Sequence, residues 1–208
     1  MKKYPFLFVG LLLGVLLAAC SREREAIEPG KQYQNAFPLA VGNYWVYRTT
    51  ITPSTGEKQI FNTVDSVWIE KDTTINGIPT FVQRSTRYHT LKTYLSDSAD
   101  CIVSKTLQYR SIEFSTNFRD TLEREPPFYL MMLDANAETQ VWAGIFRTVN
   151  CKSLIKTEPS DQRNWPMHDP IFMVSEQKLY ANNVGLVKKI TYAYGNTIEE
   201  DLVRYKIR

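Results

Sequence analysis

Residues 180–208 read YANNVGLVKKITYAYGNTIEEDLVRYKIR, and this stretch has the clearest strand pattern in the chain. Between residues 186 and 194 the side chains alternate between two faces, as they do along a β-strand. Gly195-Asn196 supplies a turn, and a second alternating run follows over residues 203–207. This pattern predicts an antiparallel hairpin at the end of the domain, where strand pairing would hold the carboxyl terminus in place.

The same period of two continues toward the amino terminus. NYWVYRTTI, residues 43–51, reads as a strand, and Ile75-Asn76-Gly77-Ile78 is the strongest hairpin signal in the sequence. Asn-Gly tolerates the positive φ angles of a type I′ turn, whose twist matches that of the flanking strands. We expect the returning strand over residues 80–92 and another strand pair around residues 96–100, which together form an antiparallel meander.

The middle of the chain leaves two alternatives open. Residues 127–142, PFYLMMLDANAETQVW, fit either a short helix or a buried strand with a loop, because short apolar runs do not settle the period. Tyr and Phe are abundant at 12 and 10 copies, against 9 Gly, a composition that favours sheets. The predicted fold is therefore mainly β: a single antiparallel domain, a β-barrel or strongly curved sheet, with at most a short helix.

The amino-terminal segment is typical of a secretory signal. Lys2 and Lys3 precede an apolar run over residues 6–19, which ends in small residues before Cys20. The run is shorter than the roughly 20 residues that a helix needs to cross a bilayer. A cleaved signal is therefore favoured over a membrane-spanning helix.

Leu17-Ala18-Ala19-Cys20 resembles the lipobox of bacterial lipoproteins. The resemblance implies that diacylglycerol is attached to the Cys20 thiol, that cleavage occurs before Cys20, and that a fatty acid such as palmitate acylates the new amine. Several acyl chains on one residue hold a protein durably on a membrane. Ser21 follows the cysteine in place of Asp, which by the same resemblance favours the outer membrane, with the domain in the periplasm or at the cell surface.

The lipobox sets the expected domain boundaries. Residues 1–19 are expected to be the lipoprotein signal peptide, residues 20–37 the lipidated cysteine and a flexible tether, and residues 38–208 the antiparallel β domain. The tether is polar, contains Pro29-Gly30 and shows no sustained apolar period.

Two stretches resemble uncharacterised secreted β-rich lipoproteins. FPLAVGNYWVY, residues 37–47, contains the opening Pro-Leu-x-x-Gly-x-x-Trp-x-Tyr, and YANNVGLVKKITY, residues 180–192, contains a Val-Gly-Leu-Val strand. The resemblance implies a β-rich fold and no particular activity.

Charge and cysteine content narrow the classes of partner. The formal net charge is +3, and residues 1–19 contain Lys2 and Lys3 but no acid, so the rest of the chain carries +1. A near-neutral domain gives no electrostatic reason to expect nucleic acid as a partner. Cys101 and Cys151 leave two alternatives open: a disulfide closing a loop of about 50 residues, worth about 4 kcal/mol, or two separate buried thiols.

The sequence contains no recognisable catalytic or metal-binding motif. There is no Gly-x-Ser-x-Gly elbow or phosphate loop, and two isolated histidines, His89 and His168, are too few for a zinc site. We therefore expect neither a metal nor another cofactor. His89 is predicted to lie in a strand. The most site-like cluster is Trp165, His168 and Asp169, in a proline-rich loop that is a candidate for ligand binding.

The sequence thus predicts a non-enzymatic, membrane-anchored envelope lipoprotein that acts as a binding or scaffold module. The alternative is a carrier that holds a lipid or another hydrophobic ligand in the cavity of a curved sheet. The expected partners are the membrane, through the lipid on Cys20, and either an envelope protein or a hydrophobic ligand.

Overall fold

The computed structural model describes residues 32–98, 100–107, 109–157 and 171–208. Its elements are twelve β-strands, which form one antiparallel sheet and a single domain. The strands are β1 Tyr44–Thr52, β2 Gln59–Ile75, β3 Ile78–Ser85, β4 Thr93–Ser98, β5 Cys101–Lys105, β6 Arg110–Ser115, β7 Glu123–Glu125, β8 Phe128–Val141, β9 Gly144–Thr157, β10 Ile171–Ala181, β11 Gly185–Ala193 and β12 Asn196–Lys206.

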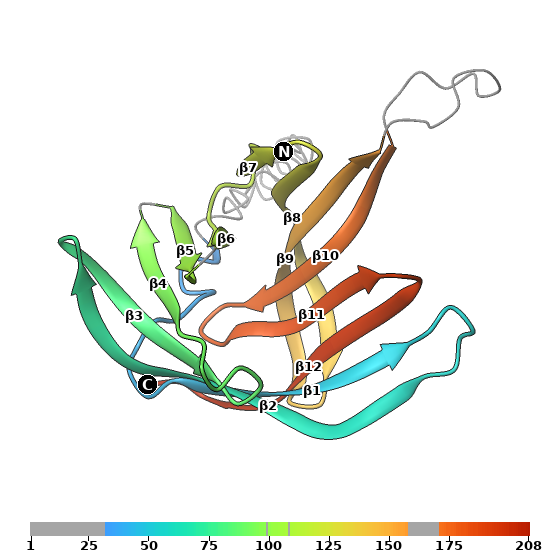
Figure 1. The fold of residues 1–208 in the computed structure, drawn as a ribbon, viewed down its shortest axis with the longest axis horizontal. Coiled ribbons are helices and arrows are strands. Elements are labelled where there is room, and N and C mark those ends of the chain that lie inside the picture. Colours follow the sequence, from blue (N-terminus) through green and yellow to red (C-terminus); the bar gives the residue numbers. More distant parts are fainter. Residues whose placement is uncertain (1–31, 99, 108, 158–170) are drawn as a thin grey trace, which may run out of the picture.

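The strand order places the first and last strands together in the middle of the sheet. The order is β6-β5-β4-β3-β2-β1-β12-β11-β10-β9-β8-β7, so the chain runs outward to β6, crosses to β7 and returns to β12. β1 pairs with β12 from Tyr44 opposite Lys206 to Thr52 opposite Thr197. The sheet curls strongly, so that β4–β6 rise opposite β8–β10 (Figure 1). The predicted antiparallel, strongly curved sheet is confirmed.

One predicted turn lies where the sequence indicated it, and a second is displaced by one residue. Asn76 and Gly77 adopt φ angles of 51° and 80° between β2 and β3, as a type I′ turn requires. At the β11–β12 turn, Tyr194 and Gly195 have φ angles of 51° and 74°, so this turn begins one residue before the predicted Gly195-Asn196 pair.

The structure decides the open alternative in the middle of the chain. Phe128–Val141 is strand β8, which pairs with β9, so the short-helix interpretation is wrong. A register shift between Leu133 and Ala137 bends the strand, and Asn136 within it has a φ of 67°. The extra residues of this bulge explain why the apolar side chains do not show a simple period of two.

One predicted strand is shorter than expected. β3 ends at Ser85, and residues 86–92 form a loop, so His89 lies in this loop and not in a strand. The Thr86 N–H donates to the Ser66 carbonyl at 2.9 Å, and the Ser66 N–H donates to Thr86 Oγ1 at 2.8 Å. Side-chain and backbone bonds of this kind compete with continued strand pairing.

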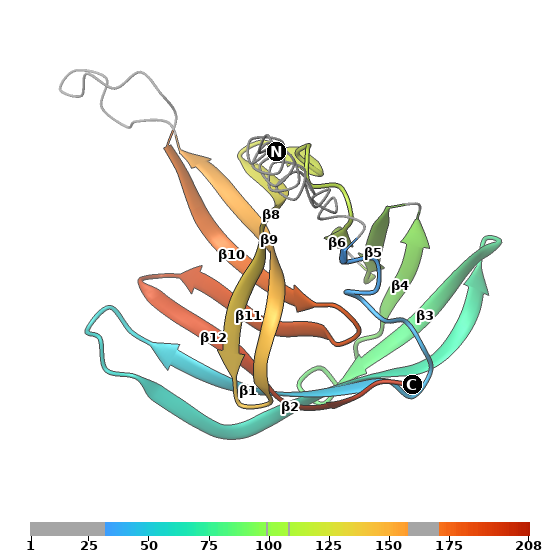
Figure 2. The same cartoon turned by 180° about the vertical axis from the view of Figure 1, so that it is seen from behind.

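The tip of the β8–β9 hairpin folds over the side of the sheet that faces away from the enclosed interior (Figure 2). The Ala143 N–H donates to the Leu202 carbonyl of β12 at 3.0 Å. Nearby, the Arg48 guanidinium lies 4.7 Å from the centre of the Trp142 ring, a cation–π contact. Val46 and Leu202 are buried in this part of the molecule.

Residues 33–43, here called the strap, pack into the mouth of the curled sheet. Tyr33 and Ala36, which lie in the segment predicted to be the tether, are fully buried against the β domain. The Tyr33 hydroxyl donates to Asn136 Oδ1 at 3.2 Å and accepts from the Asn136 N–H at 3.1 Å. The Asn183 N–H donates to the Asn35 carbonyl at 2.9 Å. The strap is thereby fixed to β8 and to the β10–β11 turn.

Within the described ranges, none of the elements is a helix long and apolar enough to cross a membrane. The predicted signal peptide, Cys20 and the first part of the tether lie outside these ranges.

Candidate functional site

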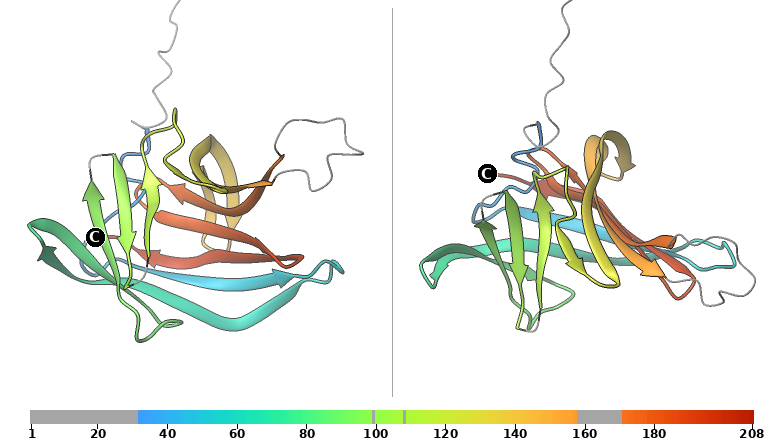
Figure 3. Two further views of the ribbon diagram at one scale, coloured as in Figure 1. Left: turned by 45° about the horizontal axis from the view of Figure 1, so that its top comes forward. Right: turned by 90° about the horizontal axis from the view of Figure 1, so that it is seen from above.

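The curled sheet forms a half-open cavity of about 380 Å³, here called the interior cavity. Side chains from β1–β6 and β10–β12 line it, together with Phe37 of the strap. The view from above shows how these strands surround a common interior (Figure 3). Ligand sites usually have volumes of about 300–1,000 Å³, so this cavity is large enough for a small molecule.

Aromatic side chains form one wall of the interior cavity. Trp45 Nε1 donates to the Val184 carbonyl at 2.5 Å, and the Tyr47 hydroxyl donates to the Leu186 carbonyl at 2.9 Å. Both residues come from β1, where residues two apart share a face. Because their polar atoms are bonded to the protein backbone, the two aromatic rings are held in position on this wall.

A second aromatic group connects the strap to both halves of the sheet. The Tyr180 ring of β10 lies 5.7 Å from the Phe37 ring and 5.3 Å from the Phe114 ring of β6, measured between ring centres. Tyr180 is fully buried, and burial is the main reason that its pKa is raised well above the ordinary tyrosine value. The phenol is therefore neutral at physiological pH.

Charged side chains form the opposite wall. The Lys178 ammonium lies 2.7 Å from Glu113 and 3.4 Å from Glu176, and the Lys189 ammonium lies 3.1 Å from the other oxygen of Glu176. Ser104 Oγ donates to Glu113 at 2.6 Å. Burial alone would raise the pKa of Glu113, but the charge and hydrogen bond of Lys178 outweigh it, and the pKa is lowered. The pKa of Lys178 is raised by its two carboxylates despite burial, so the pair is ionised at neutral pH.

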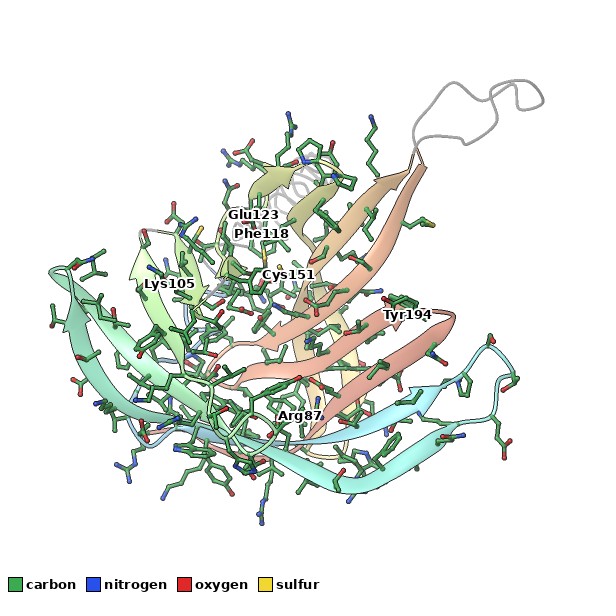
Figure 4. All side chains as sticks on the ribbon, viewed as in Figure 1. Arg87, Lys105, Phe118, Glu123, Cys151 and Tyr194 are labelled. Atoms are coloured by element: carbon green, nitrogen blue, oxygen red, sulfur yellow. The ribbon has the colours of Figure 1, made fainter. Side chains whose placement is uncertain are left out.

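The loop of residues 86–92, here called the mouth loop, lies at the rim of the interior cavity. Its position is fixed by Asp65, which accepts hydrogen bonds from Ser85 Oγ, Thr86 Oγ1 and the Arg87 N–H at 2.8–2.9 Å through Oδ1. Arg87 reaches from this loop toward β12 (Figure 4), where its guanidinium pairs with Glu200.

Two exposed apolar side chains of the mouth loop, Tyr88 and Leu91, also line the interior cavity. Their exposure places them at the opening, where they can contact both a ligand and solvent. They are therefore positions at which a polar substitution can alter binding with little effect on the core.

A second cavity, of about 490 Å³, is lined by strap residues and by side chains of β3–β6. Phe37 contributes to the lining of both cavities.

Cys101 and Cys151, for which the sequence left a disulfide and two separate thiols open, are free thiols in this structure. Cys101 of β5 is half-buried, and its Sγ donates to Ser115 Oγ at 3.4 Å. Cys151 of β9 is buried, and burial raises its pKa to about 12. A thiol in that state is a poor nucleophile.

The other predicted site residues lie outside the described part of the chain. These are the lipidation site Cys20 and the cluster of Trp165, His168 and Asp169, which remain predictions. Within the described ranges, no group of three or more His, Cys, Asp or Glu side chains could hold a metal ion.

Sequence reasoning did not find the Glu113–Lys178 pair. The two residues are 65 positions apart, and neither belongs to a motif, so no local signal could have identified them. The mouth loop did have a signal, since Ser85-Thr86 offers two hydroxyls that favour turns over strand pairing.

No protein-family model matches the chain, and a search of curated proteins finds no significant match. The solved structures that are similar to it include the following two. One, from Bacteroides fragilis NCTC 9343, is described as an exported protein with a YmcC-like fold; it has 12% identity and a TM-score of 0.49, over 82% of this chain and 98% of that one. The other, from Parabacteroides distasonis ATCC 8503, is described as a lipoprotein, with 14% identity, a TM-score of 0.44 and the same coverage. Because both TM-scores are below 0.5, we draw nothing about function from these two proteins.

Proposed function

We propose that this protein is a lipid-anchored envelope lipoprotein whose interior cavity holds a small amphipathic ligand. Of the two functions expected from the sequence, the cavity favours the carrier over the pure scaffold. The observation that supports this choice most directly is the interior cavity itself, with its aromatic wall on β1 and its ionised wall on β6 and β10.

Bonds within the protein hold the side chains that line the cavity. Trp45 and Tyr47 donate hydrogen bonds to backbone carbonyls, and the Glu113 carboxylate forms an ion pair with the Lys178 ammonium. A ligand therefore meets side chains already in position, which lowers the entropy cost of binding. The mixture of aromatic and ionised side chains suits a molecule with both an apolar body and a polar group.

The pKa values of Glu113 and Lys178 support a binding function rather than catalysis. A general acid or base works best when its pKa lies near the working pH. The pKa of Glu113 is lowered and that of Lys178 is raised, so both move away from neutrality. We infer that the pair is structural and that the protein is not an enzyme.

The anchor is proposed from the sequence. The lipobox ending at Cys20 supports lipidation, and Ser21 supports sorting to the outer membrane. In this account the membrane is one partner, and the strap begins the folded domain at Tyr33, close to the anchor. Radiolabelled palmitate tests this part: we expect incorporation in the wild-type chain and its loss in Cys20→Ala. Equal labelling of both would exclude the anchor.

A fluorescence titration tests the cavity. The uncharged dye N-phenyl-1-naphthylamine brightens when it enters an apolar site, and we expect saturable binding with one site per chain. Leu91→Asp, at the rim of the cavity, should weaken binding at least tenfold. Leu107→Asp is the matched control, because Leu107 is 92% exposed and does not line the cavity. Equal effects of the two variants, or no saturable binding, would contradict the proposal.

An exposed apolar strip supports a scaffold as the second candidate. Ile60, Phe61 and Val64 of β2 are 41–54% exposed. Exposed apolar groups of this kind can bind another protein. A reproducible cross-linked partner that is lost in Phe61→Asp, from a chain carrying no ligand, would favour the scaffold over the carrier.

A further inference from the structure

The ion pairs around the interior cavity balance most of its charges. Lys178 and Lys189 are matched by Glu113 and Glu176, which gives this cluster no net charge. Arg84, the remaining cation that lines the cavity, pairs at 3.3 Å with Glu70. No cation of these groups is left without a carboxylate, so an anionic ligand would have to displace an existing pair.

The balance is different beside the mouth loop. Arg87 faces two carboxylates, Glu200 and Asp65. Lys189, the register partner of Glu200, is already paired with Glu176. The Arg87 guanidinium pairs with Glu200 and donates to Thr49 Oγ1 at 2.6 Å. One negative charge is therefore in excess at this end of the cavity.

Asp65 carries this excess charge. Its hydrogen-bond donors are neutral: the hydroxyls of Ser85 and Thr86 and the backbone N–H of Arg87. Three of the bonds go to Oδ1, whereas Oδ2 accepts a single bond, from Ser85 Oγ at 3.0 Å. Oδ2 therefore keeps acceptor capacity, on a residue that lines the cavity.

Aromatic rings lie next to this carboxylate. Asp65 is the register partner of Tyr47, and Val67 is the partner of Trp45 on the same pair of strands. Burial, Glu200 and Asp65 together raise the pKa of Tyr47 well above its ordinary value, which places the phenol in the field of both carboxylates. Aromatic faces and a carboxylate together attract organic cations.

We propose that the interior cavity selects ligands that carry a protonated amine or quaternary ammonium group on an apolar body, with Asp65 as the charge partner. This inference rests on the proposed carrier function and names its ligand class. The ammonium group would lie beside Asp65 and the β1 aromatic rings, and the apolar body would extend toward Phe37 and Tyr180. The source can be a free amine or the head group of a lipid, since both present the same chemistry.

Calorimetric titration at pH 7 with three probes of equal chain length tests the inference on the full chain. Octylammonium is positive, octanol is neutral and octanoate is negative. We expect octylammonium to bind at least tenfold more tightly than octanol, and octanoate to bind most weakly. Lysophosphatidylethanolamine, as a further probe, distinguishes the sources: its binding supports a lipid head group, and its failure beside bound octylammonium supports a free amine.

A charge-removing substitution with a matched control completes the test. Asp65→Asn should reduce the ratio of octylammonium to octanol affinity from at least tenfold to about one, and this ratio is the readout, because Asp65 also holds the mouth loop. Glu57→Gln is the matched control, because Glu57 is an exposed carboxylate between β1 and β2 that does not line the cavity, so the preference should persist. If Asp65→Asn does not fold, the comparison of octylammonium, octanol and octanoate on the wild-type chain is sufficient to test the ammonium selectivity.

The failures of the two proposals are distinguishable. Equal binding of the three probes, or preference for octanoate, would overturn the ammonium selectivity and leave the carrier function in place. Absence of binding by all the probes, together with no saturable dye binding, would overturn the carrier function itself.

Discussion

The Lys178 ammonium lies 2.7 Å from the Glu113 carboxylate, and this contact joins β10 to β6. The two strands are not neighbours in the sheet: β6 is one edge, and β10 is separated from it by seven strands. The Phe114–Tyr180 contact connects the same two strands. Side-chain contacts, rather than backbone pairing, thus close the curled sheet around its cavity at this point.

Breaking this pair is expected to destabilise the protein. Glu113→Gln should lower the free energy of unfolding by about 2 kcal/mol, less than the 3–5 kcal/mol typical of buried pairs, because Lys178 keeps Glu176. Lys178→Met leaves Glu113 without a cationic partner at hydrogen-bond distance and should cost about 3 kcal/mol. The double variant should cost at least 1 kcal/mol less than the sum. Urea unfolding measures all three, and strictly additive losses would show that the pair is not coupled.

The lowered pKa of Glu113 predicts a pH dependence of stability. A carboxyl group whose pKa is lower in the folded state stabilises the protein above its unfolded pKa, about 4.3, and this contribution is lost as the pH falls through the folded value. Unfolding free energies between pH 7 and pH 3 should therefore fall more steeply in wild type than in Glu113→Gln. Parallel plots of unfolding free energy against pH for wild type and Glu113→Gln would contradict the lowered pKa of Glu113.

Much of the fold could be predicted from the sequence, because strand pairing and turns leave local signals. The Asn76-Gly77 turn and the paired strands at the carboxyl terminus are examples. The bend of β8 at its bulge was not predictable, since its register depends on β9. The position of the strap was missed as well. Tyr33 looks like part of a polar segment, and its burial depends on Asn136, a residue 103 positions away.

The buried strap predicts that residues before 38 contribute to stability. Tyr33→Ala should cost about 3 kcal/mol, as large aromatic deletions in cores do, and Tyr33→Phe about 1 kcal/mol for its hydrogen bonds to Asn136. Thermal unfolding gives both values. Unchanged melting temperatures in both variants would place the domain boundary at residue 38, as the sequence first indicated.

The Gly185 position predicts a sharp steric effect. Gly185 has a φ of +100°, and a Cβ there would lie 3.0 Å from Trp45 Nε1, which donates to Val184. Gly56 has a φ of +87° with open space around it, so Gly56→Ala should cost only the backbone penalty of about 1 kcal/mol. Gly185→Ala should cost at least about 1 kcal/mol more, because the indole loses its hydrogen bond. If Gly185→Ala and Gly56→Ala lower the free energy of unfolding equally, the close approach of residue 185 to Trp45 is excluded.

The two thiols predict a simple pattern of alkylation. In Cys20→Ala, which leaves Cys101 and Cys151, iodoacetamide should modify Cys101 in the native protein and both residues after unfolding without reductant. Cys151 is protected by burial and by its pKa of about 12. Mass spectrometry counts the adducts, and two unmodified cysteines in the unfolded, unreduced chain would instead reveal the disulfide left open by the sequence.

Native mass spectrometry of the lipidated protein, extracted from its own membranes, tests the carrier account most directly. We expect one additional small molecule per wild-type chain, retained in Leu107→Asp and reduced in Leu91→Asp at the rim of the cavity. A bare protein mass in the wild-type chain, with a reproducible cross-linked protein partner, would contradict the carrier and favour the scaffold.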